Sequence, residues 1–309
     1  MNPTTVHPDA AFEPRVIAPA HNAMTRPLYW SIRRELWENR SVYLAPLIVA
    51  GVVLFASMFS VFGLPRRIET LASQPAKLHA AITKPFAMAP APIMLASFLV
   101  GLFYSLDALY GERRDRSILF WKSLPVSDRT VVLSKASIPI VVLPLIALAL
   151  SLATFTIMLL AASAILLANG MSPATLWREV HFIQEPLTML YGLTVHALWF
   201  APVYCWLLLI SAWARRMPLL WVILPPFAIV AIERIIFGST NFVSLLRYRV
   251  VGAMQEAFET QVGRPGVIER VWQLEPARFL SAPGLWLGLI FAGACIAVAV
   301  RLRRTREPI

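Results

Sequence analysis

Six long runs of apolar residues constrain this chain more than any other feature. The runs lie at 42–64, 90–109, 136–168, 187–213, 218–237 and 283–300. A helix of about 20 residues crosses a hydrocarbon layer of about 30 Å, and each run is about that long or longer. Hydrophobic residues make up 58% of the chain and charged residues 15%, whereas a soluble domain has about 45–50% and roughly 25%. We therefore predict an all-α integral membrane protein with six transmembrane helices.

Two of the runs contain prolines that disturb a regular helix. The run 136–168 would be roughly 50 Å long as a helix, which exceeds one perpendicular crossing. We expect Pro139 and Pro144 to kink it, or its ends to protrude. The run 218–237 contains the pair Pro225-Pro226, which removes backbone hydrogen bonds near its middle. We expect this fifth helix to be bent or broken there.

The N-terminal region divides into two parts. Residues 1–24 are polar and rich in proline and contain no apolar core of a signal peptide, so we expect disorder there and insertion through the first transmembrane helix. Residues 25–40 instead follow a helical period. Apolar side chains share one face and polar ones the other (Leu28, Tyr29, Ile32 and Leu36 against Ser31, Arg34 and Glu38). With Trp30 and Trp37 suited to head-group depth, this predicts an amphipathic interfacial helix. An ordinary solvated helix is the alternative.

Two segments between the runs also have helical patterns. Ser172 and Pro173 provide capping chemistry for a short helix that continues to residue 180. In the large loop 238–282, apolar residues recur at helical spacing (Phe242, Leu246, Val250, Met254 and Phe258). This spacing predicts an interfacial helix that ends near Gly263.

The basic residues indicate how the chain is oriented. Its net charge is +11, and the arginines flank the apolar runs. This placement favours contact with lipid head groups, since no basic helix that could read nucleic acid stands apart from the runs. Segments on the N-terminal side of the membrane hold more Lys and Arg than those on the other side. By the positive-inside rule we expect both termini in the cytoplasm and the loop 238–282 outside.

The chain shows no motif for catalysis or for a metal. None of its lysines (Lys77, Lys84, Lys122 and Lys135) belongs to a nucleotide-binding P-loop, and no zinc-protease or nucleophile-elbow pattern occurs. Cys205 and Cys295 lie in apolar runs without metal-ligand neighbours, which indicates buried thiols. We therefore predict no enzymatic activity and no cofactor in this chain.

Ionisable residues within apolar runs are costly and often functional. Asp107 lies near the end of its run, where we expect a capping or interfacial role. His196 lies midway along the fourth run, and Glu233 and Arg234 lie in the fifth. We name His196, Glu233 and Arg234 as candidate residues of a transport pathway, with structural packing as the alternative for His196. They are few for a self-contained secondary transporter, and no internal repeat is visible.

The segment 110–135, between the second and third runs, carries the clearest motif. It contains a Glu-Arg pair, a hydroxyl residue, an apolar turn, Ser-Leu-Pro-Val-Ser, an arginine and a lysine (Glu112, Arg113, Ser117, Leu119, 123–127, Arg129 and Lys135). This order resembles the first cytoplasmic loop of ABC transporter type-2 permeases. That family usually has glycine before the hydroxyl residue, whereas this chain has Arg116. The six runs, the helix at 25–40 and the large loop 238–282 also fit the family's organisation.

The resemblance implies the transmembrane permease subunit of an ATP-driven exporter in the cytoplasmic (inner) membrane of a bacterium. Such permeases pair as homodimers or heterodimers, and a separate ATPase subunit, which holds ATP and Mg²⁺, docks on each copy. The segment 110–135 would then be the coupling loop. The implied coupling residues are Glu112, Arg113, Arg116, Ser117, Phe120, Trp121, Lys122, Leu124 and Pro125. A basic loop that only sets the topology would explain the arginines but not Phe120 and Trp121, which are typical of interface anchors.

Two other functions stay open at this point. A secondary transporter would depend on His196, Glu233 or Arg234 and on an ion gradient. A membrane-embedded enzyme or assembly factor would act without any ATPase. The substrate is also open, because lipid, peptide, drug and polysaccharide exporters share this architecture.

Overall fold

The structure, a computed structural model, describes residues 27–123, 126–180, 182–258 and 274–305. Over these residues the chain is helical, with turns and an isolated bridge between Phe258 and Leu274. The elements are α1 (Pro27–Glu38), α2 (Ser41–Phe62), α3 (Leu64–Leu71), α4 (Pro75–Met88), α5 (Pro90–Asp107), α6 (Tyr110–Arg114), α7 (Ser117–Ser123), α8 (Asp128–Ser137), η1 (Ile138–Val142), α9 (Leu143–Ala168), α10 (Ala174–Glu179), α11 (Gln184–Trp213), α12 (Pro218–Ile232), η2 (Glu233–Phe237), α13 (Asn241–Ala257), α14 (Pro276–Ser281) and α15 (Pro283–Thr305).

Six helical stretches within the described residues are long and apolar enough to cross a membrane, as predicted. They are Ser41–Phe62, Pro75–Arg114, Asp128–Ala168, Gln184–Trp213, Pro218–Phe237 and Pro283–Thr305. Each covers all or nearly all of one of the six apolar runs, so the hydrophobic pattern located every one of them. The segment 1–24 and the expected helix end near Gly263 lie outside the described residues.

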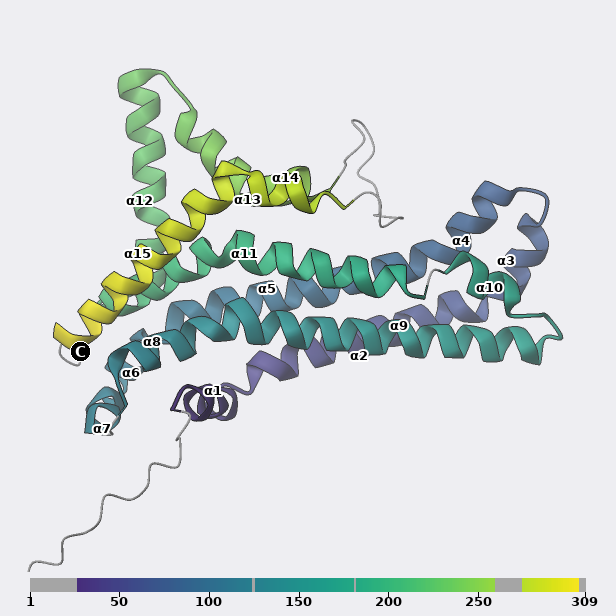
Figure 1. Cartoon of the computed structure of the whole chain (residues 1–309), viewed down its shortest axis with the longest axis horizontal. Coiled ribbons are helices and arrows are strands. Elements are labelled where there is room, and N and C mark those ends of the chain that lie inside the picture. Colours follow the sequence, from purple (N-terminus) through teal and green to yellow (C-terminus); the bar gives the residue numbers. More distant parts are fainter. Residues whose placement is uncertain (1–26, 124–125, 181, 259–273, 306–309) are drawn as a thin grey trace, which may run out of the picture.

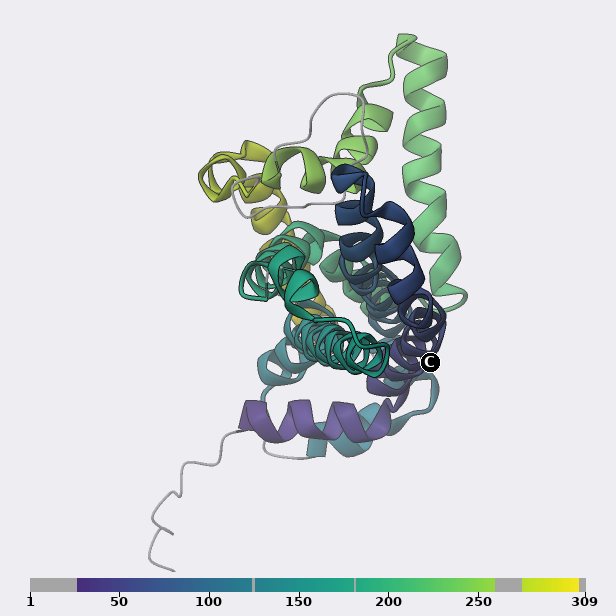
Figure 2. The same cartoon turned by 90° about the vertical axis from the view of Figure 1, so that its right-hand side faces the viewer.

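The long helices pack into an elongated bundle, from which α12 stands away (Figures 1 and 2). In the bundle α11 packs on α15 and α5, and α2 packs on α9 and α5. One end of the bundle, here called the loop end, gathers α1, α6, α7 and the last turns of α15 (Figure 1). The opposite end, here called the cap end, is formed by α3, α4 and α10.

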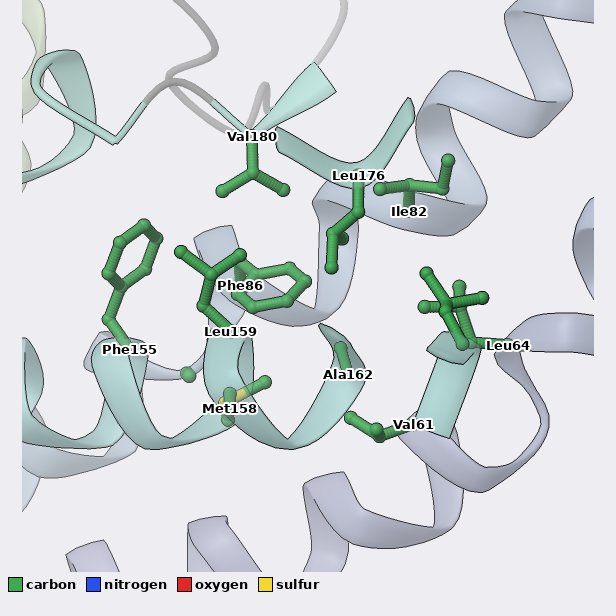
Figure 3. Packing of buried hydrophobic residues seen from close by; sticks show 12 residues of the cluster. Val61, Leu64, Ile82, Phe86, Phe155, Met158, Leu159, Ala162, Leu176 and Val180 are labelled. Carbon is green, nitrogen blue, oxygen red and sulfur yellow. The ribbon is translucent and has the colours of Figure 1, made fainter. Parts of the chain in front are cut away.

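The cap end contains the largest apolar cluster of the described residues. Its buried members come from α2, α3, α4, α9 and α10 and from residue 180 (Val61, Leu64, Ile82, Phe86, Ala89, Phe155, Met158, Leu159, Ala162, Leu166, Leu176 and Val180). Figure 3 shows Leu176 and Val180 closing over side chains that rise from α9. The short helix predicted after Ser172 is present as α10, whereas α3 and α4 were not predicted.

The third run forms one continuous helical stretch of 41 residues with a change of winding inside it. The π-helix η1 separates α8 from α9, and the Leu143 amide bonds back to the Ile138 carbonyl. Pro139 has no amide hydrogen and its ring crowds the preceding turn, and a wider turn relieves that crowding. The disturbance expected at Pro139 is therefore a π turn, and α9 continues through Pro144.

We expected the fifth run to be bent or broken at its proline pair, and the break does not occur. The helix α12 continues through Pro225 and Pro226, and the local change of winding comes later, in the π-helix η2. No residue of α12 is buried, and both prolines are partly exposed. Each proline lacks an amide hydrogen, so the carbonyl one turn earlier loses its intrahelical donor without ending the helix.

The helix α1 lies across the loop end, transverse to the long helices of the bundle (Figures 1 and 2). Ile32 and Leu36 pack beside the buried Val42 and Tyr104, as their apolar face predicted. Ser31, which we placed on the solvent side, is instead buried, and so is Glu35. The reason is that this face of α1 packs against α8, and Lys135 of α8 forms an ion pair with Glu35.

The predicted helix in the large loop is present as α13, which ends at Ala257. It is fastened to the bundle through an aromatic and arginine contact. Trp199 Nε1 donates to the Arg249 carbonyl at 2.8 Å, and the Arg249 guanidinium donates to the carbonyls of Trp199 and Gly284. Burial lowers the pKa of Arg249 from its ordinary value. The helix α13 is consequently a packed element of the bundle.

Candidate functional site

The segment 110–135 forms a helical hairpin at the loop end. The helices α6 and α7 are followed, after a short connection, by α8, whose amino terminus is capped because Ser127 Oγ accepts a hydrogen bond from the Thr130 amide at 3.2 Å. On α7, Leu119 and Phe120 are exposed by 58% and 59%. Leu124 and Pro125, both named from the sequence, lie outside the described residues.

The beginning of this hairpin is held to the carboxyl end of α11. Ser211 Oγ accepts hydrogen bonds from the amides of Leu109 and Tyr110 at 3.0 and 2.8 Å. Arg113 Nη1 donates to the carbonyls of Ala212 and Ala214 at 2.6 and 3.1 Å. These bonds satisfy carbonyls that the end of a helix leaves without intrahelical partners. The connection between α5 and α6 is therefore fixed to a second helix of the bundle.

Mostly buried ion pairs connect the hairpin to α1 and to α15. Lys135 Nζ lies 2.9 Å from Glu35 Oε1 and 3.1 Å from Glu112 Oε1. Arg303 forms an ion pair with Glu112 and a second with Asp128, at 3.1 Å from Nε to Oδ1. Glu35, Lys135 and Arg303 are nearly inaccessible to solvent. We call Glu35, Glu112, Asp128, Lys135 and Arg303 the charge network. It joins α1, α6, α8 and α15.

The environment of Glu35 keeps its carboxylate charged. Burial acts to raise its pKa, but the Lys135 ammonium and hydrogen bonds from Lys135, Arg34 and Tyr104 outweigh that effect, so the pKa lies below its ordinary value of 4.5. Tyr104 Oη donates to Glu35 Oε2 at 2.8 Å. A carboxylate with three donors can remain ionised out of water, where an unpaired one could not.

Arg34 connects this network to the exposed part of the hairpin. Its guanidinium lies 3.9 Å from the centre of the Trp121 ring, in a cation–π contact. The same guanidinium lies 2.7 Å from Glu35 and 3.5 Å from Glu112. Trp121 in turn meets Phe120 edge to face, with ring centres 4.9 Å apart. The aromatic pair on α7 thus rests on α1 through one arginine.

The remaining residues of the predicted coupling set have distinct positions. Arg116 has a φ of 57°, in the left-handed region that favours glycine. Ser117 Oγ donates to the Glu112 carbonyl at 3.4 Å, and Lys122 is exposed. Glu112 and Arg113 are buried. The predicted set therefore divides into internal anchors and an exposed helix.

The three candidate pathway residues do not come together. His196 lies within 3.1 Å of Tyr204 Oη and packs against Phe200. Glu233 accepts hydrogen bonds from Ser239 and from the amides of Asn241 and Phe242, so it caps the beginning of α13. Arg234 lines a separate pocket of about 360 Å³ beside α13. Both His196 and Glu233 thus have hydrogen-bond partners within the chain, and a role of the three residues in transport stays a prediction.

Sequence reasoning missed five residues of the charge network and its contacts, namely Arg34, Glu35, Tyr104, Asp128 and Arg303. Glu35 and Ser31 are four residues apart and share a helical face. Two polar residues on one face of a helix predicted to lie in the interface could have suggested a polar contact with the bundle. Nothing local marks Arg303, whose partner Glu112 lies on a helix far away in the sequence. No group of residues that could hold a metal ion occurs among the described residues.

The chain matches no protein-family model, no curated protein and no solved structure.

Proposed function

We propose that this protein is the transmembrane subunit of an ATP-driven exporter and that a separate ATPase subunit docks on α7. The carrying observation is the helix α7, which exposes Leu119 and Phe120 beside the half-buried Trp121, in a hairpin that buried ion pairs hold at the loop end. Large apolar and aromatic side chains bordered by arginines are typical of protein interfaces. A loop that only sets membrane topology needs neither the aromatic pair nor a buried anchor.

The anchoring of the hairpin suits the transmission of movement. The charge network attaches it to α1 and α15, and Arg113 attaches it to α11. A displacement of α7 by a docked ATPase would therefore move several helices of the bundle together, because packed helices and ion-pair networks are not continuously deformable. Nucleotide-driven closure of two ATPases on a pair of these subunits would then open and close a path between them.

The proposal includes a topology with both termini in the cytoplasm of a bacterium and α1 in the membrane interface. In support, α1 exposes Trp30 and Trp37, and the Arg33 guanidinium lies 5.4 and 5.0 Å from their ring centres. Tryptophan and arginine together suit the depth of lipid head groups. The transverse orientation of α1 relative to the long helices agrees with a helix in the membrane plane (Figure 2).

The test is co-purification of an ATPase subunit with the full chain from its native membrane, followed by transport-coupled ATP hydrolysis. We expect Phe120→Ala combined with Trp121→Ala to abolish both. The matched control is Phe55→Ala with Phe59→Ala, another exposed edge-to-face pair with ring centres 5.4 Å apart on α2, which should leave the ATPase bound. An unchanged complex in the Phe120/Trp121 variant would refute docking on α7.

A further inference from the structure

The backbone of the turn between α11 and α12 is held in one conformation, although the turn is exposed. The Ala214 amide bonds to the Ile210 carbonyl at 2.8 Å, and Arg113 binds the Ala214 carbonyl from the other side. Met217 then takes a φ of 48°, a left-handed conformation that is costly for a residue with a side chain. Pro218 begins α12 at once. The conformation of residues 214–217 is therefore held by its surroundings.

This constraint leaves two arginines and two tryptophans around one pocket. Trp213, Ala214, Arg215, Arg216 and Trp221 line a volume of about 510 Å³. The two indole rings meet edge to face at 4.6 Å and are both more than a third exposed. Arg215 and Arg216 are exposed and form no ion pair with any described residue. No acidic side chain lines the pocket, so it carries two uncompensated positive charges.

The pocket adjoins a long apolar surface. The helix α12 starts at the turn, and no residue of it is buried. Its exposed side chains near the turn include Leu219, Leu220, Ile223 and Leu224. A ligand that satisfies the whole site must carry negative charge at one end and extended hydrocarbon at the other. An anionic phospholipid has both, and it is supplied by the membrane that the apolar helices require.

We propose that Arg215 and Arg216 bind the head-group phosphate of an anionic phospholipid whose acyl chains lie along α12. Guanidinium groups bind phosphate oxygens with paired hydrogen bonds, and tryptophans favour the boundary between head groups and acyl chains. An acidic segment of a partner protein would match the arginines but would leave the apolar surface of α12 unused. The inference does not rest on the proposed ATPase, since the lipid site is complete within this chain.

The experiment measures lipid binding to the purified full chain by native mass spectrometry and by thermal unfolding in detergent. We expect phosphatidylglycerol to remain bound and to raise the melting temperature, and phosphatidylcholine to do neither. Each basic residue near a membrane surface strengthens the binding of anionic lipid. Losing two of them should weaken the affinity for the lipid by about 30-fold. Arg215→Gln with Arg216→Gln should therefore lose one bound phosphatidylglycerol and its thermal effect.

The matched control is Arg66→Gln with Arg67→Gln, a second exposed arginine pair that follows an apolar helix but has no flanking tryptophans. It should keep the lipid that the Arg215/Arg216 variant loses. Equal loss in both variants would reduce the effect to net charge and overturn the proposal. Equal protection by inorganic phosphate alone would overturn the lipid assignment. So would an Arg215/Arg216 variant that keeps its phosphatidylglycerol but no longer binds a protein partner.

Discussion

Lys135 lies between two carboxylates, Glu35 and Glu112, and is buried with them. A buried network of charges rarely gives more stability than well-packed apolar residues would, because the cost of desolvating the charges offsets their attraction. Removing one member has a different consequence, because the charges that remain have lost their partner in a medium that solvates them poorly. The charge network therefore serves to fix one arrangement of the helices at the loop end more than to add net stability.

We predict that Lys135→Ala lowers the free energy of unfolding by about 3–5 kcal/mol, the range for breaking a buried pair. Lys122→Ala removes an exposed lysine from the neighbouring helix α7 and should change it by less than about 0.5 kcal/mol. Thermal unfolding of both variants in the same detergent measures the difference. Similar melting temperatures for the two variants would show that the network does not hold the loop end together.

The lowered pKa of Glu35 predicts how stability depends on pH. Because the folded-state pKa lies below the ordinary 4.5, this carboxylate contributes stability that is complete above about pH 4.5 and is lost as the pH falls through the lower, folded value. The melting temperature of the wild type should therefore fall more steeply than that of Glu35→Gln between pH 5 and pH 3. The control Glu69→Gln, at an exposed position, should follow the wild type. Parallel curves for Glu35→Gln and the wild type would contradict this assignment.

The helical elements show where sequence patterns succeed and where they stop. Runs of apolar residues located all six candidate spans, because a long uncharged run has few other stable conformations. Apolar spacing located α13, and the capping residues Ser172 and Pro173 located α10. The helix α3 is amphipathic but only eight residues long, and Pro85 interrupts the pattern of α4, so neither helix was predicted. The π turn at Pro139 and the unbroken α12 show that a proline in the sequence does not by itself tell whether a helix breaks or changes its winding.

The packing of α15 provides a prediction at this scale. A side chain added at Gly288 would meet Pro202 and the Arg249 guanidinium, whereas one added at Gly293 on the same helix would meet nothing within 4 Å. Gly288→Val should therefore displace Arg249 and loosen α13, with a loss of about 1–3 kcal/mol. Gly293→Val should be near neutral. Hydrogen exchange of α13 distinguishes the two variants, and equal protection in both would show that Gly288 does not seat Arg249.

At the scale of the whole molecule, the contacts between residues far apart in the chain could not be predicted from the sequence. The contacts of Glu35 with Lys135, and of Glu112 with Arg303, join residues that lie far apart in the chain and share no periodicity. The amphipathic pattern even placed Ser31 on the wrong side, because it treats polar residues as solvent-facing. The aromatic pair of the candidate site, Phe120 and Trp121, could be identified from the sequence because aromatic residues are unexpected in a basic loop.

The proposed orientation can be measured on intact cells with a maleimide that does not cross membranes. Cys205 and Cys295 are both buried, so the wild type provides a low background. Lys77→Cys, at the cap end, should be labelled from outside. Phe120→Cys and Thr305→Cys, at the loop end, should be labelled only after the cells are opened. Labelling of either loop-end cysteine in intact cells would reverse the orientation.

The stretch Asp128–Ala168 is too long to lie wholly within the hydrocarbon of a membrane, so part of the molecule lies in lipid and part in water. Its 41 residues rise roughly 60 Å, twice the hydrocarbon thickness of about 30 Å. If the charged turns of α8 lie outside the hydrocarbon at one end, the helix leaves it again near Phe155, where the apolar cluster of the cap begins. That cluster would then be stabilised by water's exclusion of apolar surface, a force absent among helices surrounded by lipid. Urea should accordingly melt the cap while the membrane helices stay folded.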